Sequence, residues 1–394
     1  MTTLTALEIV GARGPRSLVD QTVRVVTRVT GAGQAIRVEV GNRYGGTPLP
    51  GGTRPLHIVA ATAARRAQGA GLVTGTVRTL TFAGAREVTV APGETTVSDV
   101  LALSVEAGED LAISMQVESA AVPPAHGASA VTSFVTAPRS GDHTADLAGG
   151  AFTERTSSTP IVTAVDVRSA RLRGTIAVTG GSTVDGTGST LDGHNDFPSQ
   201  LSSRIRRELP PGRQQAVVNQ GIGGTTAASG QCSLPAFGPS VDERLAHDTL
   251  GTAGLTHLVV VAGTNDIGFG CTGDQIIGAF RSILRQAAQR RLIVLISTIT
   301  PRTANTAVQN AERAKVNDWV RAGRNCSGEC DRSLDFDAVV RDRGNPNQID
   351  PSLDSGDGIH PNPEGYRREA ESVPLDVLRL QREPPQKTGV MVHG

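Results

Sequence analysis

Two patterns of hydrophobic and polar positions divide the chain. From Thr22 to about Val135, apolar residues fall at nearly every second position in short runs that glycine, proline and acidic turns separate. These runs are Thr22–Val29, Ala35–Val40, Arg86–Val90 and Asp110–Val117. A period of two is typical of half-buried strands, and the spacing of the turns is that of a β-sandwich. The pattern predicts an all-β first domain.

Beyond residue 160 the pattern changes to strands and helices in alternation. Strands are expected at Ile161–Val167, Ile176–Thr179, Ala216–Val218, Thr256–Ala262, Leu292–Ile296 and Leu334–Phe336. Helices are expected where Phe197, Leu201, Ile205 and Leu209 recur every fourth residue, over 274–290, over 311–321 and after Pro363. Such alternation predicts a parallel sheet with helices on both faces.

The domain organisation follows from these patterns and from the length of 394 residues, which is enough for two hydrophobic cores. We expect a β-sandwich domain with its connection at residues 1–159 and an α/β domain at 160–382. Residues 383–394 are expected to form a loose tail.

Charge and hydropathy exclude some classes of function. The 38 basic residues equal the 38 acidic ones, and no basic run is present, so neither nucleic acid nor an anionic membrane surface is an expected partner. No apolar run reaches the roughly 18 to 20 residues of a membrane span. The first residues lack the basic and apolar regions of a signal peptide.

Four cysteines lie in the second half of the chain, and their spacing does not fit the paired Cys-x2-Cys of a zinc site. Two disulfides are possible, Cys232 with Cys271 and Cys326 with Cys330. Free thiols are the alternative, and no metal site is expected.

Chemically useful residues follow several of the expected strands. Ser182 comes after Gly180-Gly181, Asn265 after Gly263-Thr264, and the glycines of Asn219–Gly224 would let a backbone N–H approach a ligand closely. Open α/β sheets bind ligands at the carboxyl ends of their strands. Asp357 precedes His360 by three residues, so the carboxylate could orient the imidazole while the ring accepts the serine proton.

These four segments, in this order, resemble the sequence blocks of the SGNH hydrolases, also called the GDSL esterase and lipase family. The resemblance covers roughly residues 172–380 and implies a flavodoxin-like three-layer α/β domain, here preceded by a sandwich that we expect to be jelly-roll-like. It implies that Ser182 is the nucleophile and that Asp357 and His360 complete the triad. It also implies an oxyanion hole formed by Ser182, Gly224 and Asn265, and no cofactor.

Gly224 is preferred to Gly223 because the family pattern runs Asn-x-x-x-x-Gly from a residue matching Asn219. Two positions depart from the family. Gly181 stands where the family usually has aspartate, and Thr264 where it usually has glycine. In the family this carboxylate helps to arrange the active-site loops. Its absence leaves three alternatives, namely lower activity, a changed pocket or a protein that no longer catalyses.

The resemblance implies a secreted serine esterase that hydrolyses short acyl esters, acetyl esters above all, of a small molecule or a carbohydrate. A cytoplasmic location is the alternative, given the first residues. A lipase or arylesterase of the same family is a second expectation, and Gly181 keeps open a catalytically weak binding protein. The sequence indicates no oligomeric state.

Overall fold

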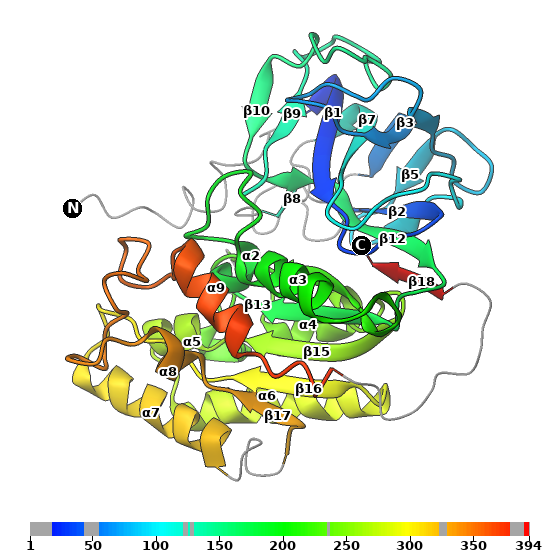
Figure 1. Ribbon diagram of the computed structural model, residues 1–394. Helices are drawn as coiled ribbons and strands as arrows, with labels where there is room; N and C mark the ends of the chain where they lie inside the picture. The colour runs from blue at the N-terminus through cyan, green and yellow to red at the C-terminus, as the bar shows by residue number, and fades with distance from the viewer. Residues whose placement is uncertain are drawn as a thin grey trace. The chain divides into compact units, whose positions relative to one another are not determined.

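The computed structural model describes residues 18–42, 55–120, 125–126, 130–234, 237–322, 329–378 and 390–393 (Figure 1). These residues fall into two compact units. The first lies within residues 1–170 and 389–394, and the second within 171–388.

The first unit consists of antiparallel sheets, consistent with the β-sandwich that the alternating pattern predicts. Its largest sheet has the order β10-β9-β1-β7-β3-β4, with β5 also paired to β3. Its strands are β1 (Leu18–Arg28), β3 (Leu56–Arg65), β4 (Arg78–Thr79), β5 (Val88–Val90), β7 (Asp110–Ala120), β9 (Ser133–Val135) and β10 (Glu154–Thr156). A two-stranded sheet joins β8 (Ala125–His126) to β11 (Thr159–Pro160).

A four-stranded antiparallel sheet corrects two expectations from the sequence. It has the order β18-β12-β2-β6, formed by β2 (Ala35–Gly41), β6 (Thr95–Val97), β12 (Val162–Ser169) and β18 (Val390–His393). The strand expected to open the α/β domain therefore belongs to the first unit, since β12 pairs with β2. A period of two does not reveal which sheet a strand will join.

The expectation of a loose tail is wrong for its last described residues. Val390–His393 form strand β18, which pairs antiparallel with β12. This segment is rich in β-prone residues, and it pairs with the edge of β12 that β2 leaves open. The earlier part of the expected tail lies outside the described residues.

The second unit contains the predicted parallel sheet, in the order β14-β13-β15-β16-β17. Its strands are β13 (Thr175–Gly180), β14 (Ala216–Gly221), β15 (Leu255–Val261), β16 (Ile293–Ser297) and β17 (Arg332–Leu334). In chain order this is 2-1-3-4-5, the flavodoxin-like arrangement, in which the connections change direction between the first and third strands. Those strands are β13 and β15, so a ligand site is expected at their carboxyl ends.

Helices cover both faces of this sheet (Figure 1). The unit contains α2 (Ser182–Asp185), α3 (Phe197–Glu208), α4 (Val241–Asp248), α5 (Thr264–Phe269), α6 (Gly273–Gln289), α7 (Ala307–Arg321), α8 (Phe336–Val340) and α9 (Pro363–Ser372), with short 3-10 turns at Pro211–Arg213 and Gly230–Cys232. Alternate residues of β13 face opposite ways. Ile176 and Val178 pack in a core with α3, α8 and α9, while Ala177 packs in a core with α4, α6 and α7.

Candidate active site

Ser182 stands where β13 ends and the short helix α2 begins. The strand ends at Gly180, Gly181 is the N-cap residue, and Ser182 is the first residue of the helix. Its backbone N–H therefore belongs to the first turn of a helix, where N–H groups have no partner within the helix. Among the described residues no acceptor is recorded for the Ser182 N–H. The site thus presents both the hydroxyl and a backbone donor of one residue.

His360 and Asp357 form a hydrogen-bonded chain with this serine. The Ser182 Oγ lies 2.7 Å from His360 Nε2, and His360 Nδ1 lies 2.6 Å from Asp357 Oδ2. The ring tautomer with a proton on Nδ1 donates to the carboxylate and leaves Nε2 to accept from the hydroxyl. Hydrogen bonds within the turn fix its conformation. The other Asp357 oxygen, Oδ1, accepts the backbone N–H groups of Ile359 and His360 at 2.9 Å each.

The charge state of Asp357 suits this contact. Burial raises the pKa of Asp357, but the hydrogen bond and positive charge of His360 and two backbone N–H groups lower it more. The resulting pKa lies well below the usual range of aspartate. Asp357 therefore remains ionised near neutral pH and can stabilise a protonated imidazole.

Asn265 lies in the first turn of α5, beyond the end of β15. Its Nδ2 donates one hydrogen bond to the carbonyl oxygen of Thr225 at 2.9 Å. An amide nitrogen carries two donors, so one remains for a ligand. The contact holds the carboxamide against the segment that follows β14.

Gly223 and Gly224 differ in what their N–H groups do. Gly223 donates to Asp185 Oδ2 at 2.9 Å, whereas within the described part of the chain no acceptor is recorded for the Gly224 N–H. Gly224 has φ of +84°, and a Cβ at this position would lie 2.2 Å from the ring of Phe237. Only glycine fits both the backbone conformation and the space.

Two carboxylates hold the segment after β14 in place. Asp185 is buried and accepts the Gly223 N–H, so it caps the loop that follows β14. Asp266, also buried, accepts the N–H groups of Ala227 and Ala228 at 2.8 and 2.9 Å. Burial raises the pKa of Asp266 to about 6. Sequence reasoning missed this role, for which the adjacency of Asp266 to Asn265 was the only signal.

A small pocket opens beside Ser182 and Asn265. Its volume is about 20 Å³. It is lined by Gly181, Ser182, Thr183, Thr225, Val261, Ala262, Gly263, Thr264, Asn265, Ser297, Thr298, Ile299 and Thr300. A space of this size holds about one water molecule or a methyl-sized group.

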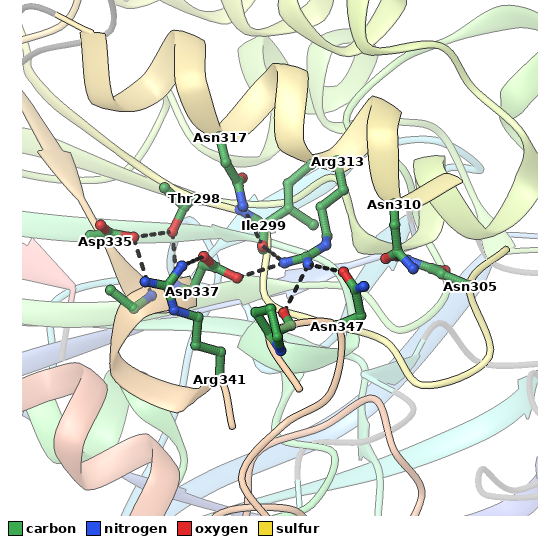
Figure 2. Close-up of polar contacts among 12 residues, drawn as sticks. Thr298, Ile299, Asn305, Asn310, Arg313, Asn317, Asp335, Asp337, Arg341 and Asn347 are labelled. Carbon is green, nitrogen blue, oxygen red and sulfur yellow. Dashed lines mark hydrogen bonds and ion pairs between the residues drawn. The ribbon is translucent and has the colours of Figure 1, made fainter. Parts of the chain in front are cut away.

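The wall that follows β16 is held from behind by α7 and α8. Figure 2 shows Asn317 and Arg313 directed at Ile299. Asn317 accepts the Ile299 N–H at 2.7 Å and donates to its carbonyl at 3.0 Å. Arg313 is buried and donates to Asp337 at 2.5 Å, while Thr298 Oγ1 accepts the Asp337 N–H at 2.9 Å. The pocket wall is therefore fixed by paired groups.

A disulfide links the segments that carry Gly224 and Asn265. The Cys232–Cys271 bond, with a Cα–Cα distance of 5.4 Å, confirms one of the two predicted disulfides. Cys326 lies outside the described residues, so its pairing with Cys330 stays a prediction.

Two further features of the described residues concern metal binding and membrane insertion. They contain no group of three or more His, Cys, Asp or Glu side chains arranged to hold a metal ion. Every helix in the same residues is too short or too polar to cross a bilayer.

Comparison with known proteins gave matches for the second unit. Residues 178–368 match the sequence model of the GDSL-like Lipase/Acylhydrolase family. No curated protein matches the chain.

Three similar solved structures illustrate the extent of the match. An α/β hydrolase enzyme from the metagenome of Lake Arreo, Spain, is 16% identical, with 53% of this chain and 96% of that chain covered and a TM-score of 0.40. A mutant of an acetyl-xylooligosaccharide esterase from Geobacillus Stearmophilus is 16% identical, with 53% and 96% covered and a TM-score of 0.39. A member of the lipolytic protein G-D-S-L family from Veillonella parvula is 18% identical, with 50% and 94% covered and a TM-score of 0.36.

Proposed function

The chain contains a GDSL-like lipase/acylhydrolase domain at residues 178–368, and on this premise we propose that the protein is a serine esterase that removes short acyl groups, acetyl above all, from an alcohol. The observation that carries the proposal is the chain of contacts from Ser182 through His360 to Asp357, at 2.7 and 2.6 Å. A hydroxyl, an imidazole and an ionised carboxylate in this order can generate a nucleophile at neutral pH.

The reaction proceeds in two steps. Ser182 Oγ attacks the ester carbonyl carbon while its proton passes to His360 Nε2. The tetrahedral intermediate collapses, the alcohol leaves with the proton from His360, and the acyl group remains on Ser182. Water then loses a proton to His360, attacks the acyl-enzyme and releases the acid, which restores the serine.

We assign the stabilisation of the oxyanion to three donors. They are the N–H groups of Ser182 and Gly224 and the second Nδ2 proton of Asn265. Neither backbone N–H has an acceptor among the described residues, which supports this assignment, and Asn265 is anchored on Thr225 O. Donors held in advance stabilise a developing charge without reorganisation during the reaction.

The size of the pocket supports a short acyl group. About 20 Å³ beside Ser182 accepts a methyl group, bounded on one side by the wall at Ser297–Thr300. That wall is held by Asn317 on the backbone of Ile299. We therefore favour an acetyl esterase over a lipase, with a carbohydrate as a candidate for the alcohol.

A catalytically weak binding protein is the second candidate, because Gly181 stands where the family that the sequence resembles usually has aspartate. Catalysis is favoured because the carboxamide of Asn265 is held by the carbonyl oxygen of Thr225. A side chain at residue 181 is therefore not needed to orient the carboxamide.

The test is turnover of p-nitrophenyl acetate by the wild type, Ser182→Ala and the control Ser203→Ala, a serine of α3. We expect Ser182→Ala to lose activity by at least about 1000-fold and the control to keep it. Equal rates for wild type and Ser182→Ala would reject the nucleophile. If the wild type hydrolyses no ester in a panel that runs from acetyl to dodecanoyl esters and includes acetylated sugars, the result would favour the binding protein.

We also propose that the protein acts outside the cell. The Cys232–Cys271 disulfide supports this, since such bonds persist in oxidising compartments. Fractionation of the source cells tests it, and recovery of the protein only in the cytoplasm would reject it.

A further inference from the structure

Arg302 belongs to the loop that follows β16, two residues after the pocket wall ends at Thr300. This loop is tied to the turn that carries Asp357 and His360. The N–H of Thr303 donates to the carbonyl oxygen of Gly358 at 2.9 Å. The arginine is therefore fixed beside the turn with the proposed acid and base.

The guanidinium of Arg302 lies against Gly268 of α5. A Cβ on Gly268 would lie only 1.9 Å from Arg302 Nη1, so the missing side chain makes the space that the guanidinium occupies. Gly268 follows Asn265, the proposed oxyanion donor, by three residues in the same helix. Arg302 thus lies between the element that carries Asn265 and the turn that carries His360.

The hydrogen-bonding capacity of this guanidinium is unused. Arg302 is half-buried, yet its side chain forms no hydrogen bond or ion pair with any described residue. The carbonyl oxygens of Ile267 and Gly268 accept hydrogen bonds from Gln309 Nε2, at 2.9 and 3.3 Å. A half-buried guanidinium with free N–H groups can bind an anion that reaches it.

Asp357 does not fill this role. Its charge interacts with Arg302 and raises the pKa of the arginine against the larger lowering by burial. The two side chains form no ion-pair contact. One Asp357 oxygen is hydrogen-bonded to His360 Nδ1, and the other accepts two backbone N–H groups. The guanidinium is thus left open to a ligand.

We propose that Arg302 binds a carboxylate on the alcohol part of the ester substrate. This inference rests on the proposed esterase function and deepens it. The planar fork of arginine matches the two oxygens of a carboxylate. The carboxylate belongs to the alcohol part because Arg302 is not among the residues that line the small acyl pocket. A singly charged group fits better than a phosphate dianion, which the nearby Asp357 would repel more strongly.

The test uses matched acetyl esters that differ in one charge. The 2-, 3- and 4-acetoxybenzoates carry the carboxylate at increasing distance from the ester, and the corresponding acetoxybenzamides are neutral. We expect the wild type to hydrolyse at least one anionic isomer with kcat/KM about 10-fold or more above that of its amide. Most of this difference should lie in KM, and it should shrink as ionic strength rises.

Arg302→Gln should remove this preference. Gly268→Ala should reduce it, because the new Cβ would clash with the guanidinium and displace it while residue 302 stays an arginine. Arg290→Gln, an exposed arginine at the end of α6, is the control and should keep the wild-type ratio. If Arg302 instead acts only through Asp357, Arg302→Gln would lower kcat/KM equally for the acetoxybenzoate and for its amide. It would also shift the pH profile of kcat/KM. That result would overturn the proposal, as would a wild type that prefers no anionic isomer.

Binding measurements separate this inference from the proposed function. Ligand-observed NMR on Ser182→Ala reports binding of each acetoxybenzoate without turnover. Loss of the signal in the Ser182→Ala, Arg302→Gln double variant would support the carboxylate site even if no ester were hydrolysed. A signal that is unchanged in the double variant, or absent from Ser182→Ala for all three isomers, would reject the site. Turnover of p-nitrophenyl acetate by the wild type decides the esterase function independently.

Discussion

The carboxamide of Asn265 is oriented by a backbone atom. One Nδ2 proton is bound to Thr225 O, so the second has a defined direction. A Cβ on Gly181 would lie 3.1 Å from both Asn265 Nδ2 and Thr225 O, which is closer than side chains normally approach. Glycine at residue 181 therefore preserves this contact, and Thr225 O is the acceptor beside Asn265 in the absence of an aspartate.

Asn265→Ala should lower kcat on p-nitrophenyl acetate by about 100-fold or more while KM changes little. The reason is that the donor is needed most when charge develops on the substrate oxygen. Steady-state kinetics at neutral pH measures this. Asn310→Ala, on α7, is the control and should behave as wild type. Parental kcat in Asn265→Ala would remove Asn265 from the oxyanion hole.

At the scale of elements, the segments after β14 and β15 act as one block. The Cys232–Cys271 disulfide connects them over 39 residues, and Asp266 on α5 accepts two N–H groups from the segment after β14. The relative placement of Gly224 and Asn265 thus depends on covalent and hydrogen-bonded links that lie outside the triad.

The double variant Cys232→Ser, Cys271→Ser should destabilise the second unit by about 4 kcal/mol, the loop-closure entropy of a cross-link of this length. Chemical denaturation followed by the fluorescence of Trp319 measures the loss, since this is the only tryptophan of the chain and lies in α7. Superimposable unfolding curves for variant and wild type would show that other links suffice.

At the scale of the whole molecule, a buried acid makes stability depend on pH. Glu369 lies on α9, and neither carboxylate oxygen has a hydrogen-bond partner among the described residues. Burial raises the pKa of Glu369 from 4.5 to about 8. Between these values the folded state keeps a proton that the unfolded chain has lost. The contribution to stability is therefore complete below pH 4.5 and decreases as pH rises toward 8.

Glu369→Gln should remove this dependence. At pH 5 we expect little change in the free energy of unfolding. By pH 8 the variant should be more stable than the wild type by a few kcal/mol, because the difference grows by at most about 1.4 kcal/mol per pH unit. Denaturation curves of both proteins at a series of pH values, read by Trp319 fluorescence, measure it. Glu371→Gln, exposed on the same helix, is the control. Parallel pH profiles for Glu369→Gln and wild type would contradict the assignment.

The sequence by itself determined the parts that depend on local pattern. Periods of two and of nearly four residues fix which face of a strand or helix can be buried, so the antiparallel unit and the parallel sheet followed from them. Glycines and polar residues after expected strands singled out Ser182 and Asn265, because parallel strands bring their carboxyl ends to one edge. Asp357 and His360 were singled out by their spacing of three residues.

Tertiary structure alone decided what depends on partners distant in the chain. It assigned β12 to the first unit and paired Val390–His393 with it. Alternation in a sequence shows which face of a strand is buried, but it does not show which strand lies beside it. It also revealed Thr225 O beside Asn265 and the space at Gly268 that Arg302 occupies. A sequence pattern cannot predict the role of the Thr225 carbonyl or of the space at Gly268. Each role depends on which atoms from distant parts of the chain lie beside it.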